Sequence, residues 1–390
     1  MTGSLKKRSD NSWSIVLFLG RDPITGKKRQ KWHTVTGNKK AAERELARLV
    51  NEINSGAYVE PAKITVADYL KRWLRDYAKT NVSGKTYERY EEISVKHLIP
   101  ALGSLPLSKV QPLHIQAYYS QALESGRTNG DGGLSAQTVL HHHRVLREAL
   151  NRAVKWQLLV RNPADSVEPP KPQRREMRAI DETQTAWLFE VARGTRFYAP
   201  VVIAVTTGMR RGEFLGLQWP DINLMDGNAI VRRSVEQTNA GVRFKSPKRR
   251  KGHRISLSPI TVETLKQHQA EQEQQKNLLG EVYQDSNLVF AREDGSIWKP
   301  DTFTADFAKL ARKAGLKGVR LHDMRHSHAT QMLGQGIHPK IVSERLGHST
   351  VGITMDIYSH VLPGMQENAV LKVDAVLKAA MDRQKKAKPV

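Results

Sequence analysis

The chain of 390 residues contains no cysteine. Disulfide bonds, thiolate nucleophiles and cysteine-based zinc sites are therefore excluded, and a metal site would have to use histidines and carboxylates. Acidic residues are also scarce relative to basic ones, since 39 Asp plus Glu stand against 62 Lys plus Arg, a formal net charge of +23. This excess predicts a polyanionic partner, nucleic acid first and an anionic membrane surface second.

Long hydrophobic runs are missing as well. The longest, such as Val201–Val205 and Ile15–Leu19, are far shorter than the roughly 20 residues that a membrane-spanning helix needs. Lys6, Lys7 and Arg8 are followed by only a short strand-like run, which is not typical of a secretory signal. We therefore expect a soluble, intracellular protein with no membrane partner.

The first segment, residues 1–58, reads as a small sheet plus one helix. Two β-rich runs, Ser12–Leu19 and Arg29–Thr36, flank a turn-rich insert and predict a hairpin. Asn38 is a typical N-cap for the apolar helical pattern that follows it. Because a twisted hairpin fits a DNA groove, we interpret its basic cluster as a DNA-binding surface; the residues in question are Lys27, Lys28, Arg29 and Lys31.

Residues 63–165 read as a helical bundle. Apolar stripes run from Thr65 to Tyr77 and over Tyr87–Leu98, Pro112 opens a third helix, and Ser135 caps a longer one. The proline-rich stretch Asn162–Arg175 cannot continue a helix, so we expect a stiff extended tether there.

Residues 176–390 mix helices with a few β-like runs, at Ala229–Val235, Val242–Lys245 and His253–Leu257. The fold class is therefore multidomain α+β. It comprises a small sheet plus helix, an all-α domain, and a mixed, mainly helical domain with a small sheet.

Four segments of this last domain carry the residues with distinctive chemistry: Thr206–Glu213, Leu321–Thr330, Leu346–His348 and Ile357–His360. Two arginines and two histidines of these segments, with a tyrosine, a lysine and no carboxylate cluster, form a set suited to holding a phosphate diester and attacking it. Arginine offers planar, permanently charged donor pairs that match two phosphate oxygens. His322 and Arg325 share one helical face, and Glu213 lies three residues after Arg210, where it can orient the arginine.

The order Arg, Lys, His-x-x-Arg, His, Tyr resembles that of the tyrosine recombinases, the family of phage lambda integrase and Cre recombinase. Thr207–Glu213 resembles the first arginine motif of that family, His322–Arg325 the second, and Leu346–His348 followed by Tyr358 the closing pair. The match covers roughly residues 180–362, and four motifs in order are far more specific than any one of them.

The resemblance implies a role for each matching residue. Tyr358 would attack the scissile phosphate, form a 3′-phosphotyrosyl link and release a 5′-hydroxyl. Arg210 and Arg325 would hold the non-bridging oxygens, while His322 and His348 would hydrogen-bond the phosphate and assist proton transfer. Lys245 best matches the lysine that protonates the leaving oxygen, although other basic residues crowd the same loop and stay open as alternatives and as DNA contacts: Lys248, Arg249, Arg250 and Lys251.

The same resemblance implies an integrase of a phage or other mobile element. Residues 63–165 would form the core-binding domain, and Trp13–Ile53 resembles a small three-stranded arm-binding domain. The partners would be double-stranded DNA attachment sites, a homotetramer formed on that DNA, and an accessory excision or DNA-bending protein. Covalent catalysis conserves bond energy, so no cofactor, ATP or metal is expected. The place of action would be the cytoplasm of a bacterial cell, on nucleoid DNA.

Several histidines have other interpretations. Consecutive helical residues point about 100° apart, so His141–His143 cannot converge on one metal ion, and we interpret them as surface or interhelical residues. His322 and His326 are spaced like a zinc-protease pair, but Asp323 follows the first histidine and the glutamate base is missing. We therefore interpret His326 as a buried residue supporting the site.

Two other functions remain open. A DNA-binding regulator without catalysis would also explain the charge and the hairpin, but not the His-x-x-Arg and Tyr motifs. A type IB topoisomerase would share the tyrosine chemistry and relax supercoils without joining two sites. The arm-like first domain favours the integrase.

Overall fold

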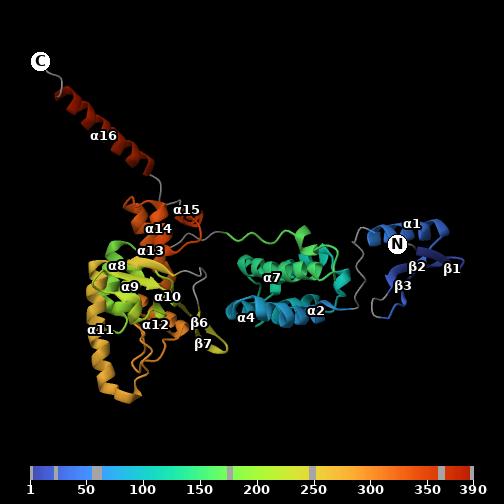
Figure 1. Cartoon of the computed structure of the whole chain (residues 1–390), viewed down its shortest axis with the longest axis horizontal. Helices are drawn as coiled ribbons and strands as arrows, with labels where there is room; N and C mark the ends of the chain where they lie inside the picture. Colours follow the sequence, from blue (N-terminus) through green and yellow to red (C-terminus); the bar gives the residue numbers. More distant parts are fainter. Residues whose placement is uncertain are drawn as a thin grey trace. The chain divides into compact units, whose positions relative to one another are not determined.

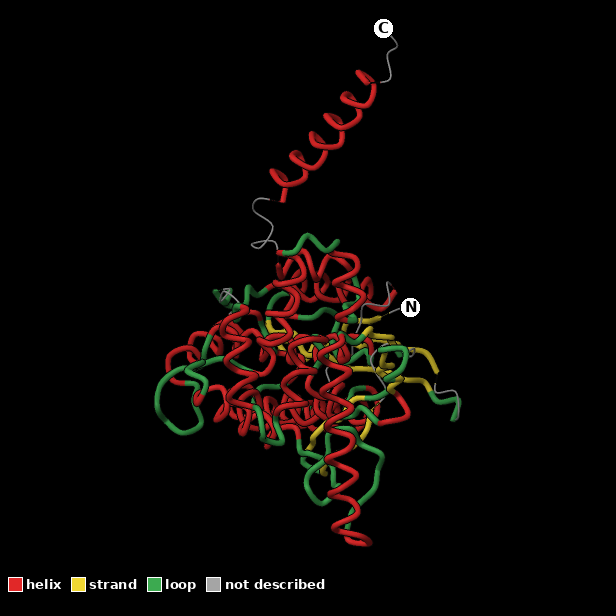
Figure 2. Tube along the Cα trace, turned by 90° about the vertical axis from the view of Figure 1, so that its left-hand side faces the viewer, coloured by secondary structure: helices red, strands yellow, loops and turns green. Residues whose placement is uncertain are grey.

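The computed structural model describes residues 3–21, 25–54, 64–173, 179–245, 252–358 and 365–386. The chain divides into two compact units, residues 1–174 and 175–390. Figure 1 traces the helices and strands along the chain, and Figure 2 shows how far helix predominates over strand.

The first segment is an antiparallel sheet of three strands in the order β1 (Gly3–Ser9), β2 (Ser12–Arg21), β3 (Lys28–Thr36), with helix α1 (Lys39–Asn54) on one face (Figure 1). The predicted hairpin is present, and β1 adds the third strand that the family resemblance implied. Ile15, Leu17 and Leu49 form the buried centre between sheet and helix. Asn38 caps α1, because its side-chain oxygen accepts a hydrogen bond from the Ala41 amide at 2.9 Å.

The second segment is helical throughout. Thr65 and Ser135 accept hydrogen bonds from amides three residues later, at 3.1 and 3.2 Å, and so cap the first and last helices. Two π-helical turns, Leu74–Ala78 and Ser94–Leu98, continue their helices without a break in direction. The elements are α2 (Val66–Trp73), α3 (Lys79–Asn81), α4 (Gly84–Ile93), α5 (Ile99–Leu102), α6 (Pro112–Ser125) and α7 (Ala136–Lys155), with 3-10 turns at Leu107–Lys109 and Pro163–Ser166.

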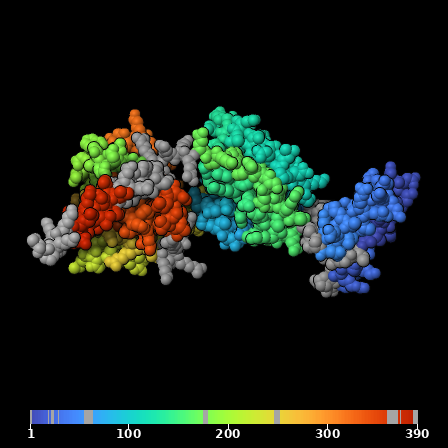
Figure 3. All heavy atoms as spheres, turned by 90° about the horizontal axis from the view of Figure 1, so that it is seen from above, coloured from blue at the N-terminus to red at the C-terminus, as the bar shows by residue number. Residues whose placement is uncertain are grey.

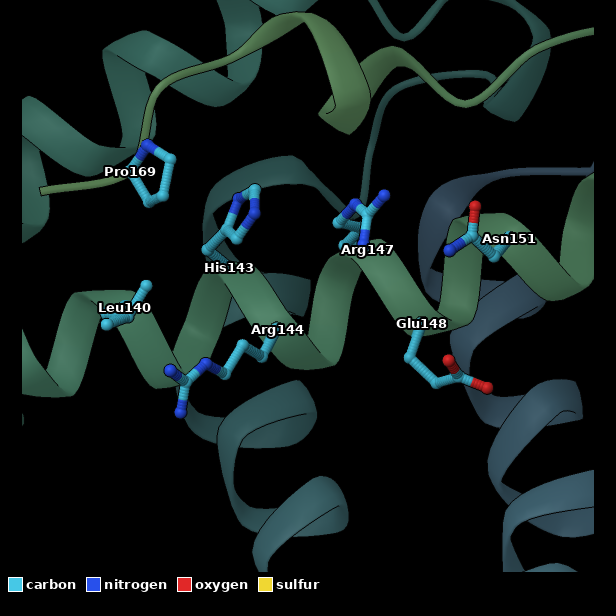
Figure 4. A pocket seen from close by; sticks show the side chains of 7 residues that line it. All are labelled: Leu140, His143, Arg144, Arg147, Glu148, Asn151 and Pro169. Atoms are coloured by element: carbon cyan, nitrogen blue, oxygen red, sulfur yellow. The ribbon is translucent and has the colours of Figure 1, made fainter. Parts of the chain in front are cut away.

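The expected tether begins later than Asn162. The Asn162 side chain donates to the Arg147 carbonyl oxygen at 3.0 Å, and Asp165 pairs with the Arg147 guanidinium at 2.7 Å. Val167 is buried against the helical core. Beyond it, Pro169 lies over α7, where a pocket of about 300 Å³ is lined by His143, Arg147 and their neighbours (Figure 4). Local side-chain hydrogen bonds therefore hold the start of this proline-rich stretch on the helical segment.

Helix α9 (Tyr198–Thr207) is the centre of the last unit. It is apolar on every side and almost entirely buried, which is typical of a helix packed on all faces. Around it lie α8 (Glu182–Ala192), α10 (Arg211–Leu215), α11 (Pro259–Leu279), α12 (Pro300–Lys313) and α13 (Leu321–Gly334), with 3-10 turns at Trp219–Asp221 and Gly280–Val282.

Two small antiparallel sheets complete this core. One has the order β4 (Ile222–Asn223), β5 (Asn228–Val231), β8 (His253–Ser256), and the other is the hairpin β6 (Ser234–Thr238), β7 (Gly241–Lys245). All three predicted β-like runs contain strands, and the first of them is divided between β5 and β6. The chain then continues through α14 (Pro339–Leu346), α15 (Val351–Tyr358) and α16 (Met365–Lys386).

No helix in the described ranges is both long enough and apolar enough to cross a lipid bilayer.

Candidate active site

Two glycine turns bring the sequence motifs together. Gly208 ends α9 at φ +65° and Gly347 ends α14 at φ +63°, in the left-handed region that glycine adopts at little cost. A Cβ on Gly208 would lie 2.6 Å from the Leu346 side chain, so the first and third motifs approach each other more closely than any other residue would allow.

Arg325 ties these two turns to α13. Its guanidinium donates to the Gly208 carbonyl oxygen at 2.8 Å and to the Leu346 carbonyl oxygen at 2.6 Å, and the side chain is almost fully buried. Burial lowers the pKa of Arg325 to about 10, and the positive charge of Arg210 adds to that lowering. At neutral pH the guanidinium therefore keeps its charge in a site from which water is largely excluded.

Arg210 lies on the same pair of turns but reaches solvent. Its guanidinium donates to Glu213 at 2.7 Å and to the Gly347 carbonyl oxygen at 3.1 Å, and 44% of its side chain is exposed. The Glu213 carboxylate also accepts the Arg210 backbone amide at 2.9 Å, which completes a capping box at the start of α10. The expected orienting contact of Glu213 is thus present as two hydrogen bonds, and Arg210 presents a fixed cation at the surface.

His348 is held by the helix that follows it. Its Nδ1 lies 2.8 Å from the hydroxyl oxygen of Thr354 on α15, and both side chains are buried. Burial lowers the pKa of His348 to about 4, with Arg325 and Arg210 adding to the effect. His348 is therefore neutral at physiological pH and can donate from Nε2 when Nδ1 accepts from Thr354.

Tyr358 ends α15 in a buried position. Only 1% of its surface is exposed, and its hydroxyl lies 2.8 Å from Nδ1 of His326 on α13. Burial raises the pKa of Tyr358 to about 12, while the charge of Arg325 acts in the opposite direction. Figure 3 shows the orange to orange-red atoms of this part of the chain at the surface of the last unit.

His322 occupies the exposed side of α13, and its ring meets the His326 ring edge-on at 4.8 Å. Neighbouring protein atoms remove part of the water around His322 and lower its pKa, and Arg325 adds to this shift. His322 is thus the surface member of a histidine pair whose buried member contacts Tyr358.

Lys245 lies on the β6–β7 hairpin beside this group. It pairs with Ser234 across the strands, and a Cβ on Gly212, two residues after Arg210, would lie 2.5 Å from the Ser234 hydroxyl oxygen. The Lys245 ammonium makes an ion pair with Glu236 at 3.1 Å, and Glu236 also binds Arg243 at 2.8 Å. Lys248, Arg249, Arg250 and Lys251 lie outside the described residues.

The site thus gathers residues far apart in the sequence around one buried and one exposed arginine. A family model described as the phage integrase family matches residues 178–364, and a second, the N-terminal SAM-like domain of phage integrases, matches residues 65–123. The chain belongs to the phage integrase family. This family is that of the tyrosine recombinases, and the protein is therefore a site-specific DNA recombinase of the integrase type.

The integrase has relatives along almost its whole length. A XerC-like tyrosine recombinase of Caldanaerobacter subterraneus is 27% identical, with 93% of this chain and 96% of the relative covered. The ICEBs1 integrase of Bacillus subtilis is 26% identical, with 96% and 100% covered. The Tn1549 transposon integrase, solved in complex with a circular intermediate DNA, has the same fold at 20% identity, with a TM-score of 0.65 over 76% of this chain and 95% of that one.

One residue that the sequence motifs do not include joins several parts of the integrase site. Arg345 donates to the Thr206 carbonyl oxygen at 2.9 Å, to the Ser256 carbonyl oxygen at 3.0 Å and to Nε2 of His328 at 2.9 Å. It therefore connects α14 to α9, β8 and α13. The sequence signal for Arg345 is only its place directly before Leu346–His348.

The predicted DNA-binding residues of the first segment do not all share a face. Lys28 belongs to the exposed face of β3, whereas Lys31 points to the face that α1 covers, since it pairs with the buried Leu17. Lys27 is exposed just before β3, and the Arg29 side chain is not described.

The exposed face of this sheet has further basic residues. Lys6 lies 5.1 Å from the centre of the exposed Trp32 ring, and Arg8 donates to the Thr34 hydroxyl oxygen at 3.3 Å. The alternation of Ser4, Lys6 and Arg8 with Leu5 is the sequence signal for this arrangement.

The three consecutive histidines do not form a metal site. Nδ1 of His142 lies 2.7 Å from the Tyr118 hydroxyl, and Nδ1 of His143 lies 2.7 Å from the Tyr119 hydroxyl. Both histidines are buried between α6 and α7, so they are interhelical and not surface residues. Within the residues that the structure describes, no three histidine, aspartate or glutamate side chains gather as a metal ion would require.

Proposed function

We propose that this integrase inserts and excises a mobile DNA element by cutting and rejoining its attachment sites through a 3′-phosphotyrosyl link to Tyr358. The observation that carries the proposal is the arrangement around the two glycine turns. Arg325 binds both turns, Arg210 binds one of them and Glu213, and Tyr358 ends the helix that holds His348. A phosphate diester held there meets fixed positive charge and a nucleophile.

In this proposal Arg210 and Arg325 hold the two non-bridging oxygens of the scissile phosphate. Both guanidinium groups are held by backbone carbonyl oxygens, so little reorganisation is needed as charge develops on the phosphorane. His348 and His322 hydrogen-bond the same phosphate and assist proton transfer. Lys245 protonates the leaving 5′ oxygen, with Lys248, three residues later in the chain, as the alternative.

The remaining segments extend the DNA contact. We assign residues 1–58 to an arm-type DNA-binding domain, 63–165 to a core-binding domain and 176–390 to the catalytic domain. In the first of these, Lys6, Arg8 and Lys28 on the exposed sheet face, with Lys27 just before β3, would contact DNA. Arg29 and Lys31, and Lys248, Arg249 and Arg250 in the catalytic domain, stay proposals from sequence.

Four copies of the chain would act together on two DNA sites, aided by an accessory excision or DNA-bending protein, on nucleoid DNA in the bacterial cytoplasm. The final helix supports an assembly of copies, because it carries an exposed apolar stripe formed by Val370, Val373, Leu377 and Met381. We propose that this stripe packs on a neighbouring copy. The reaction needs no metal or ATP, because the phosphotyrosyl link conserves the energy of the broken bond.

A recombination assay tests this function. Purified protein is incubated with a plasmid that carries both ends of its own element and the target site, in chelator and without nucleotide. Joined recombinant product supports the integrase. Relaxation of any supercoiled plasmid without joining would instead support a topoisomerase, and tight binding without either product would support a non-catalytic regulator.

A further inference from the structure

The nucleophile proposed above shares a buried hydrogen bond with a histidine. His326 on α13 and Tyr358 on α15 are both buried, their rings are 5.8 Å apart, and 2.8 Å separates Nδ1 from the phenolic oxygen. This distance is within the reach of a general base for the proton that it removes.

The protonation states of the two groups fit a bond in which the tyrosine donates. Burial lowers the pKa of His326 to about 4, and the proximity of His322 adds to that lowering. Burial raises the pKa of Tyr358 to about 12. At neutral pH the imidazole is therefore uncharged with one ring nitrogen free to accept, and the phenol keeps its proton.

The reaction cannot proceed well with the phenol in that state. A phenol with a raised pKa is almost wholly protonated at neutral pH, and its oxygen becomes a strong nucleophile only as the proton leaves. Arg325 is a cation without an acceptor, and Nδ1 of His348 is bonded to Thr354. His322 is one ring further out, in edge contact with His326.

We propose that His326 is the catalytic residue that accepts the proton of Tyr358 as the phenolic oxygen attacks the scissile phosphorus. The bond from the tyrosine oxygen to phosphorus forms while the bond from phosphorus to the 5′ oxygen breaks. The phenolic proton goes to Nδ1 of His326, and the 5′ oxygen takes its proton from the general acid, assigned above to a lysine. In the rejoining step a 5′-hydroxyl attacks the phosphotyrosine and gives its proton back to the lysine, while the bond from phosphorus to the tyrosine oxygen breaks and His326 returns its proton to Tyr358.

The charged groups around His326 allow it to hold the phenolic proton for a short time. His322 and Arg325 of α13 and its N-cap residue Arg320 disfavour a positive imidazole, while the buried Asp323 carboxylate favours it. The Asp323 carboxylate thus stabilises the imidazolium, and the nearby positive groups make it return its proton easily.

The test follows covalent cleavage of a nicked duplex that carries one end of the element, by the full-length chain in a single turnover. His326→Asn places an amide near the position of Nδ1 but cannot take up a proton. We expect cleavage to slow by about 100-fold or more, the usual share of a general base, while DNA binding is kept. His268→Asn is the matched control, because His268 is a part-buried histidine of the same unit bonded to the Val289 carbonyl oxygen, and it should cleave at the wild-type rate.

A fluorinated tyrosine in place of Tyr358 separates proton transfer from positioning. Its lower intrinsic pKa supplies the phenolate without a base, so it should restore much of the rate lost in His326→Asn. A defect in His326→Asn that fluorination does not reduce would overturn the proposal, as would unchanged or faster cleavage.

If His326→Asn fails to bind DNA, fluorinated tyrosines are placed at position 358 of the otherwise wild-type chain. The dependence of their cleavage rate on the pKa of the phenol then tests the proposal. A weak dependence of rate on the nucleophile pKa supports a general base, and a rate that rises with the ionised fraction contradicts it.

The inference rests on the proposed function, and different results would refute each of them. If Tyr358→Phe still forms the covalent adduct, the proposed nucleophile is wrong. If wild type forms the adduct, Tyr358→Phe does not, and His326→Asn behaves as wild type, only the role of His326 is wrong.

Discussion

Nδ1 of His348 lies 2.8 Å from the hydroxyl oxygen of Thr354, and this bond joins a residue that we propose to bind the phosphate to the helix that ends in Tyr358. Thr354 is fully buried and lies four residues before Tyr358, the proposed nucleophile. The bond fixes the orientation of the His348 ring, and it restrains α15 against the turn at Gly347. Two residues of the proposed site thus depend on one hydroxyl that belongs to no sequence motif.

Thr354→Val therefore provides a direct test of this coupling. The substitution keeps the shape of the side chain and removes the hydroxyl, so a buried imidazole nitrogen loses its partner at a cost of roughly 1–3 kcal/mol. We expect single-turnover cleavage to fall by about 10-fold or more, with DNA binding unchanged. Thr354→Ser keeps the hydroxyl and should cleave close to the wild-type rate. Equal defects in the two variants would show that packing, and not the hydrogen bond, is what matters.

The identity of the general acid can be settled with a modified substrate. A duplex whose scissile 5′ oxygen is replaced by sulfur expels a thiolate, which leaves without a proton because its pKa is far lower. We predict that Lys245→Ala cleaves the normal substrate slowly and the sulfur substrate at the wild-type rate. Lys248→Ala, three residues further along the chain, is the matched variant. Rescue of Lys248→Ala but not of Lys245→Ala would move the role to Lys248 and leave Lys245 as the partner of Glu236.

The helical segment should lose stability in mild acid. Burial lowers the pKa of His142 to about 4, and the His97 ring, 4.6 Å away, adds to the shift. The unfolded chain, with a pKa near 6.5, takes up the proton first. The stabilisation is therefore complete above about pH 6.5 and is lost as the pH falls towards 4, on the order of 2 kcal/mol at pH 5.

Urea unfolding at pH 7.5 and pH 5 measures this loss. In His142→Gln the amide can still bond the Tyr118 hydroxyl but does not titrate, so the loss between the two pH values should be smaller. The same loss in both proteins would contradict the assignment to His142.

Removal of the final helix should separate assembly from binding. The apolar stripe of α16 is exposed, with Val370 63% and Leu377 57% accessible. A chain ending at residue 364 should bind a single site with wild-type affinity but form the complex of several copies on DNA only at higher protein concentration, as judged by gel shift and light scattering. Unchanged assembly would show that the stripe serves another purpose.

Local signals made much of the fold predictable. Caps such as Asn38 and Ser135 act over three residues, and the spacing of apolar residues marks the buried face of each helix. The family motifs likewise gave the arginines and the tyrosine in order. Such signals come from residues within a single helix or strand, so a sequence pattern is enough to predict them.

Contacts between elements that are far apart in the chain could not be predicted from the sequence. The bond between His326 and Tyr358 spans 32 residues, and Arg345 binds backbone carbonyl oxygens of Thr206 and Ser256, which any residue could supply. The start of the tether was misjudged because Asn162 and Asp165 form hydrogen bonds with α7 that proline content does not reveal. Lys6 and Arg8 could be assigned to the exposed face of the sheet only once the register of β1 was known.

The most direct test of the whole account is the covalent adduct itself. Wild type and Tyr358→Phe are incubated in chelator with labelled, nicked DNA from the ends of the element and resolved on a denaturing gel. The account predicts a protein–DNA adduct with wild type and none with Tyr358→Phe, although both bind the DNA. An adduct that persists in Tyr358→Phe, or that neither protein forms on DNA that both bind tightly, would contradict it.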